Sequence, residues 1–285
     1  MNITPLAFES MGVRSMCTHV LTDDINLVID PAVSLAPSRF GLPPHTVEEE
    51  AKEVLWGRVK EAVADADVLI VTHYHYDHVD PKEPEIYRGK RVLLKHPGRM
   101  INPSQKARAA SFIRSIKGLA EEIEYADNRT FTYGDTVIHF SRPVPHGSDA
   151  TRGYVVEVCV EAGERFVQTS DVQGPVLDEQ AAFILSQRPS VLFVDGPSTY
   201  IESPMAEVEL RRANEYLVRI IGEAGVESLV LDHHLARDID YRERIRPVLA
   251  AGEESGVRVQ VAAEFLEVEP ALLEAMRPAL YERED

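Results

Sequence analysis

Short apolar runs alternate with one long amphipathic segment in the first third of the chain. The short runs hold four to seven residues each and are rich in branched apolar side chains, which is typical of β-strands. They predict strands at 3–8, 15–21, 25–29, 68–71 and 91–94. Residues 46–66 instead carry apolar side chains every three or four positions, a spacing that predicts a helix.

A second amphipathic helix is predicted at 103–120. Its apolar residues, among them Phe112 and Ile116, recur at the spacing that places them on one helix face. Asn102 suits the N-cap position because its side chain can accept a hydrogen bond from a free backbone N–H of the first turn. Pro103 suits the first helical position, where no intrahelical donor is needed.

The remaining chain alternates strand-like and helix-like segments. Strands are predicted at 130–140 (two strands), 153–160, 165–169, 191–194, 228–231 and 257–265. Helices are predicted at 178–187, 204–222, 241–252 and 270–281. This order suits two packed sheets with helices outside, an α/β sandwich. Because no long Pro/Gly/Ser linker interrupts the chain, we expect residues 1–285 to form a single domain.

Composition narrows the class of protein. The 285 residues are 44% hydrophobic, which is enough for a large core, yet no run of eighteen apolar residues predicts a membrane span. The first residues lack the basic and apolar regions of a secretory signal. The only cysteines, Cys17 and Cys159, make neither a disulfide framework nor a Cys-based zinc site. We therefore expect a cytoplasmic protein with no membrane partner.

The charge is strongly acidic but unevenly spread. A formal net charge of −17 excludes a general nucleic-acid coat protein, because phosphate backbones would be repelled. Residues 86–120, however, hold no Asp or Glu, and Lys106, Arg114 and Lys117 fall on one flank of the predicted helix there. These side chains form either a solvated basic face or a positive rim that attracts an anionic substrate.

The most informative motif is His73-Tyr74-His75-Tyr76-Asp77-His78, directly after the predicted strand at 68–71. Alternation along an extended chain puts His73 and His75 on the same side, so both imidazoles can bind one metal ion. Asp77 and His78 follow on the turn and can reach a second ion. Imidazole and carboxylate ligands without thiolate suit zinc, manganese or iron.

Further candidate ligands follow other predicted strands. His146, Asp171 and the pair His233-His234 each lie at or shortly after a strand end. Alone, each would more often be an ordinary loop residue. Together they are what a metal site built on strand ends requires.

The order His-X-His-X-Asp-His, then His, Asp and His, resembles the metallo-β-lactamase superfamily over nearly the whole chain. The early strand that ends in Asp30-Pro31, and Gly153-Tyr154 at the start of a hairpin, are also similar to that family. Asp195-Gly196-Pro197 and Asp232-His233-His234 resemble an uncharacterised, mainly archaeal branch of these hydrolases. The resemblance implies an αββα four-layer sandwich with the metals at one edge of the two sheets.

The resemblance also implies a role for each candidate. His73, His75 and His146 would hold one metal, and Asp77, His78 and either His233 or His234 the other. We favour His233 because it comes first after the strand. Asp171 would bridge the two ions, so Asp77 and Asp171 are the candidate catalytic carboxylates. Three further carboxylates could orient the metal-bound imidazoles: Asp30, Asp195 and Asp232.

The expected function is hydrolysis by a hydroxide that bridges two divalent ions, with zinc favoured and manganese or iron as alternatives. The acid-free segment favours a phosphodiester or a similar small anionic ester. A carboxylic ester, thioester or lactone hydrolase is the alternative, and a non-catalytic metal-binding protein is a third reading. Asp171 and His233 lie 62 residues apart (233 − 171), too close for the inserted domain of large nucleases. We therefore expect a small substrate or a short nucleic-acid end, and leave the oligomeric state open.

Overall fold

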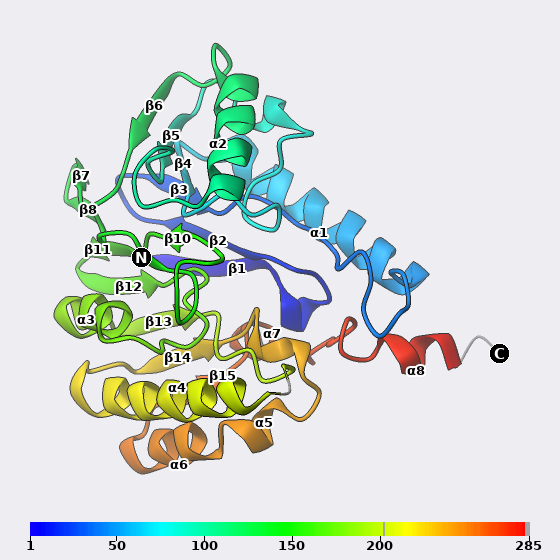
Figure 1. Ribbon diagram of the computed structural model, residues 1–285. Helices are drawn as coiled ribbons and strands as arrows, with labels where there is room; N and C mark the ends of the chain where they lie inside the picture. Colours follow the sequence, from blue (N-terminus) through cyan, green and yellow to red (C-terminus); the bar gives the residue numbers. More distant parts are fainter. Residues whose placement is uncertain (202, 283–285) are drawn as a thin grey trace.

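Two β-sheets form the centre of the computed structural model, which describes residues 1–201 and 203–282 (Figure 1). The first sheet has six strands in the order β1-β2-β3-β4-β5-β6. Their bounds are Asn2–Phe8, Met16–Leu21, Asn26–Ile29, Val68–Val71, Arg91–Leu94 and Glu122–Tyr125. β1, β2 and β3 pair antiparallel, whereas β3 to β6 are parallel.

The second sheet has seven strands in the order β15-β14-β13-β12-β11-β8-β7. In chain order these are β7 (Thr130–Tyr133), β8 (Thr136–Phe140), β11 (Val158–Ala162), β12 (Glu164–Gln168), β13 (Val191–Val194), β14 (Ser228–Leu231) and β15 (Arg258–Gln260). β12 to β15 are parallel. β9 (Val144–Pro145) and β10 (Tyr154–Val155) form a separate small ladder.

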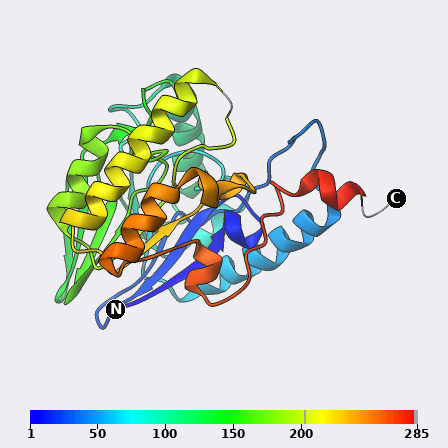
Figure 2. The ribbon, with the colours of Figure 1, turned by 90° about the horizontal axis from the view of Figure 1, so that it is seen from below.

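Helices cover the outer face of each sheet. α1 (Thr46–Asp65) and α2 (Pro103–Ile116) pack on the first sheet. The second sheet is covered by α3 (Asp178–Gln187), α4 (Pro204–Glu223) and α6 (Arg246–Ser255), which lie side by side in Figure 2. Asn102 caps α2 as predicted, since its Oδ1 accepts from the Gln105 backbone N–H at 2.8 Å.

Three apolar layers hold the sandwich together, and strand alternation produces them. In β4, Leu69 and Val71 point towards α1 and α2, whereas Val68 and Ile70 point between the sheets. Phe166 and Phe193 of the second sheet meet that inner layer and pack edge to face. The predicted αββα sandwich is thus confirmed. No helix in the described part of the chain is long and apolar enough to cross a membrane.

Several predicted elements differ at the C-terminal end. The helix predicted at 241–252 is two helices, α5 (Tyr241–Arg244) and α6, because the backbone breaks at Ile245 ahead of a proline in the first turn of α6. The strand predicted at 257–265 is only β15, followed by the short helix α7 (Ala262–Phe265). Of the helix predicted at 270–281, only α8 (Arg277–Glu282) forms.

Three differences occur earlier in the chain. The helix predicted at 103–120 ends at Ile116, and Gly118 follows with a φ of 87°, outside the helical region. The strand predicted at 153–160 is split into β10 and β11. β6 was not predicted, because it is a sheet edge and its sequence Glu-Ile-Glu-Tyr carries charged residues.

Candidate metal centre

The predicted site residues come together from the ends of several strands. The motif 73–78 follows β4, His146 follows β9, Asp171 follows β12, and His233 and His234 follow β14. Because β4, β12 and β14 each have parallel neighbours, their carboxyl ends meet at one edge of the sandwich, where ligand sites of α/β proteins form.

A first group of side chains consists of His73, His75 and His146, gathered around Asp171. One donor atom from each lies within 4.8 Å of the others. His146 Nε2 is 3.1 Å and His73 Nε2 3.6 Å from Oδ2 of Asp171. The geometry of this first group suits one metal ion held by three imidazoles and a carboxylate.

A second group consists of Asp77, His78 and His233, whose donor atoms also lie within 4.8 Å of one another. It faces the other oxygen of Asp171, since Oδ1 is 3.0 Å from His78 Nε2 and 3.7 Å from His233 Nε2. His233 Nε2 is 3.4 Å from Oδ2 of Asp77. The two oxygens of Asp171 are therefore divided between the two groups.

His234 lies beside this centre with a different environment. Its Nδ1 is 2.7 Å from Oδ2 of Asp195, and its Nε2 is 3.9 Å from Oδ2 of Asp171. Asp171, His233 and His234 form a third set of potential ligands within 4.8 Å. His234 thus faces the oxygen of Asp171 that the first group uses, whereas His233 faces the other.

The donor set fits divalent cations. His73 Nε2, His78 Nε2, His146 Nδ1 and Asp171 Oδ1 are buried atoms with no hydrogen-bond partner within residues 1–201 and 203–282. Such atoms are costly inside a protein unless something else satisfies them. Three of these atoms, His73 Nε2, His78 Nε2 and Asp171 Oδ1, point into the space between the imidazoles and Asp171. A cation there would satisfy them.

Two of the three predicted orienting carboxylates contact an imidazole. Oδ2 of Asp30 is 2.8 Å from Nδ1 of His78, and Asp195 holds His234. This is the outer-shell arrangement that fixes the tautomer of a metal-binding histidine. Asp232 differs from the prediction, because its carboxylate accepts from the backbone N–H groups of Ser10, His233 and Ala262.

Burial dominates the electrostatics of the first group. Burial, reinforced by the neighbouring His78, holds the pKa of His73 well below its usual value. Burial and His146 lower the pKa of His75 to about 4. These rings are therefore neutral at neutral pH, the form that binds metal.

Carboxylates dominate the second group. Burial disfavours a charged His78, but Asp171 and Asp30 raise its pKa well above the usual value. Burial also opposes charge on His233, and Asp171 and Asp77 nevertheless raise its pKa to about 8.

Sequence reasoning missed a buried ion pair beside the second group. Arg237 Nη2 is 2.9 Å from His233 Nε2 and 3.8 Å from Oδ2 of Asp77, while its Nε donates to Glu9 at 3.0 Å. Burial raises the pKa of Glu9 to about 7, although Arg237 opposes the shift. The position of Arg237, four residues after His233, was the one sequence signal that it lies near the site. Nothing marked Glu9 as its partner, because the two residues are 228 positions apart.

The acid-free segment contributes two residues near the centre. Gln105 Nε2 of α2 is 3.5 Å from His75 Nε2, and the guanidinium of Arg108 stacks 4.7 Å from the ring of Tyr76. Other basic residues of the segment are paired elsewhere, such as Arg91 with Glu122. Lys106, Arg114 and Lys117 are exposed, as either a solvated basic face or a positive rim requires.

No family model matches the chain. It is 48% identical over 285 residues to a UPF0282 protein from Korarchaeum cryptofilum, covering 99% of this chain and 95% of that one. Other similar proteins of the same name also come from archaea.

Solved structures with little sequence identity share the fold. A chain described as a possible metal-dependent hydrolase from Veillonella parvula is 11% identical, with a TM-score of 0.53 over 91% of this chain and 94% of that one. Unliganded yeast PDE1 is 12% identical, with a TM-score of 0.53 over 91% and 96%. The expectation of a mainly archaeal branch is confirmed, and the chain belongs to the UPF0282 proteins.

Proposed function

We propose that this protein is a hydrolase with two divalent metal ions that cleaves a small phosphodiester or a similar anionic ester. The observation that carries the proposal is the position of Asp171. Its Oδ2 faces the first group and its Oδ1 faces the second, as a carboxylate shared by two ions would. In the proposed assignment the first group binds one ion, the second group binds the other, and Asp171 contacts both.

His233 is the proposed ligand of the second group, in preference to His234. Its ring lies among Asp77, His78 and Oδ1 of Asp171. His234 faces Oδ2 of Asp171 and is held by Asp195, which suits a contact with substrate at the edge of the centre. Zinc is the proposed metal, and manganese and iron accept the same ligands.

Two divalent ions held by these residues would supply a nucleophile at neutral pH by lowering the pKa of water, and would stabilise negative charge on the substrate. The protein's own residues prepare that chemistry. Asp30 fixes the ring of His78, and the burial of nearly every ligand excludes bulk water from between the two groups. Neither a serine nor a cysteine nucleophile is needed.

Cations around the centre support an anionic substrate. Arg108 lies against Tyr76, within the 73–78 motif, and Arg152 lies six residues after His146. A neutral lactone would draw no benefit from these charges, whereas a phosphate would be attracted to them. A phosphodiester is therefore the favoured substrate class.

The test combines metal analysis with a substrate panel. We expect purified protein to bind two zinc or similar ions and to hydrolyse bis-(p-nitrophenyl) phosphate in preference to lactones. Asp171→Ala should lose metal and turnover together, whereas Asp23→Ala, an exposed carboxylate in the turn before β3, should lose neither. Activity on lactones alone would overturn the substrate class, and two bound metals without turnover on any ester would overturn the hydrolase.

A further inference from the structure

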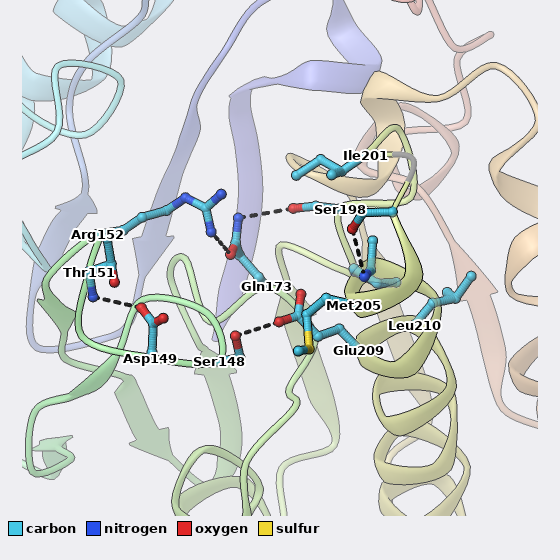
Figure 3. Close-up of a pocket in the computed structure, with 13 residues that line it drawn as sticks. Ser148, Asp149, Thr151, Arg152, Gln173, Ser198, Ile201, Met205, Glu209 and Leu210 are labelled. Carbon is cyan, nitrogen blue, oxygen red and sulfur yellow. Dashed lines mark hydrogen bonds between the residues drawn. The ribbon is translucent and has the colours of Figure 1, made fainter.

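A cavity of about 410 Å³ lies beside the metal centre, between residues 147–152 and the first turns of α4 (Figure 3). Its wall residues follow site residues closely along the chain. Arg152 comes after His146, Gln173 is two residues after Asp171, and Ser198 is three residues after Asp195. Gln105 Nε2 donates to the Arg152 carbonyl at 3.2 Å and is 3.5 Å from His75 Nε2, so this wall is also next to the centre in space, and a molecule bound at the metals could extend into the cavity.

A chain of hydrogen bonds crosses the cavity wall (Figure 3). Arg152 Nη1 donates to Oε1 of Gln173 at 2.8 Å, and Nε2 of Gln173 donates to Ser198 Oγ at 3.0 Å. The backbone N–H of Gln173 donates to Asp195, the carboxylate that holds His234. Gln173 is 7% exposed, so the wall is fixed and directly linked to the metal centre.

Gly147 makes this arrangement possible. Its φ is +92°, and a Cβ added there would lie 2.3 Å from Oε1 of Gln173. Any other residue would push the Gln173 side chain away from Arg152. The position of the Gln173 amide is thus built into the loop that follows His146.

The α4 side of the cavity carries an acidic residue and apolar residues. Glu209 of α4 accepts a hydrogen bond from the Ser148 hydroxyl, and Asp149 accepts from the Thr151 backbone N–H at 2.7 Å. Met205 and Leu210 of α4 add apolar surface. The Arg152 cation and the Asp149 carboxylate therefore stand on the loop side of the cavity, and the Glu209 carboxylate stands on the α4 side.

This charge pattern selects the kind of ligand. A guanidinium has five N–H donors, so Arg152 can bind a phosphate oxygen while it holds Gln173. The carboxylates of Glu209 and Asp149 would repel a second phosphate but accept hydrogen bonds from hydroxyl groups. A volume of about 410 Å³ is that of a small-molecule pocket, not of a polymer groove.

We propose that this cavity binds the hydroxyl-bearing organic group of a small phosphodiester, such as a polyol or a sugar. Arg152 binds the phosphate side, and Glu209 accepts a hydrogen bond from a hydroxyl of that group. The proposal rests on the proposed function for the bond that is broken. Its recognition step, however, is a property of the cavity and can be measured without turnover.

The binding test uses two probes that share a phosphate, glycerol 3-phosphate and methyl phosphate, titrated calorimetrically into the metal-loaded protein. We expect glycerol 3-phosphate to bind about tenfold more tightly, the size of one hydrogen bond to a charged acceptor. Glu209→Ala should abolish that difference and leave methyl phosphate unchanged. Arg152→Ala should weaken both probes about tenfold, and Glu215→Ala, an exposed carboxylate further along α4, should change neither.

The outcomes separate this proposal from the proposed function. Equal affinity of wild-type protein for both probes would overturn the cavity proposal even if bis-(p-nitrophenyl) phosphate is hydrolysed. Tighter binding of a four-nucleotide single strand than of glycerol 3-phosphate would overturn it too, because a polyanion would then be the ligand. If the affinities follow the expected pattern but no phosphodiester is hydrolysed, the cavity proposal is supported and the proposed reaction is wrong.

Discussion

The first and second groups of the metal centre share Asp171 but differ in their surroundings. The first group is three imidazoles packed against one another and around Oδ2 of Asp171, and burial lowers the pKa of His73 and of His75. The second group includes a carboxylate, Asp77, has Arg237 and Glu9 beside it, and contains imidazoles with raised pKa values. One group is thus nearly free of charge apart from the shared carboxylate, and the other is a charged network.

This difference indicates that the two groups bind metal by different routes. A metal ion can bind His73 and His75 without displacing protons, because the lowered pKa values leave these two rings neutral. Entry into the second group releases protons from imidazoles and displaces the Arg237 guanidinium from His233 Nε2, now 2.9 Å away. We therefore expect the first group to bind its metal more tightly at neutral pH.

Removal of Asp171 should have the largest effect, because it is the residue common to both groups. Asp171→Ala leaves the imidazoles of each group without their carboxylate, so both metals should be lost. Turnover should fall by about a thousandfold or more, as when a central member of a catalytic set is removed. Metal content by mass spectrometry and kcat on the same samples check this, and a variant that retains one full metal would show that the groups are independent.

The sequence predicted this centre well because its residues are local signals. Six consecutive residues, 73–78, carry four of the eight candidate ligands, and the others follow apolar strands that are easily recognised. The αββα fold followed from the same buried strands. The orientation of the Asp171 carboxylate, with one oxygen towards each group, depends on how the two sheets pack. No local sequence pattern predicts that packing.

Other features could not be read from one sequence for physical reasons. Glu9 and Arg237 pair across 228 residues, and nothing near Glu9 marks it. β6 is a charged edge strand that looks like a loop, because an edge needs little apolar surface. The helix predicted at 270–281 forms only in part, because a segment held by tertiary contacts need not follow its own propensity.

Single-ligand variants should separate the groups. His75→Ala should empty the first group and His233→Ala the second, so each variant should retain about half of the wild-type metal. Each should lower kcat by about a hundredfold, at the upper end of the losses for residues around a metal. His234→Ala should retain both metals, and loss of a metal in that variant would exchange the roles of the two histidines.

The orienting carboxylates should give a smaller and unequal effect. Asp30→Asn removes the acceptor that holds His78, so the metal affinity of the second group should fall between about ten- and a hundredfold. Asp195→Asn acts on His234, so metal affinity should change little while turnover falls. Competition with a chelator measures both affinities. If Asp195→Asn lowered metal affinity as much as Asp30→Asn, His234 would be a metal ligand like His78.

The pH dependence should be the mildest difference between the groups. Because the pKa of His233 is raised from 6.5 to about 8, its protonated ring stabilises the metal-free fold below pH 6.5, and this stability is lost as pH rises through 8. Metal must displace that proton and the one that His78 retains through its raised pKa, so affinity of the second group should rise by at least about tenfold per pH unit up to about pH 8. The pKa of His75 is about 4, so the first group should show no such rise.

The two single-ligand variants make this measurable. His75→Ala reports on the second group alone, and His233→Ala reports on the first. Zinc affinity is measured by chelator competition between pH 6 and 8.5. It should rise with pH in His75→Ala and stay constant in His233→Ala. Circular dichroism of the metal-free variants controls for unfolding across that range. If zinc affinity rose equally with pH in both variants, the charged network around Arg237 would not distinguish the groups. The two groups would then differ only in their ligands.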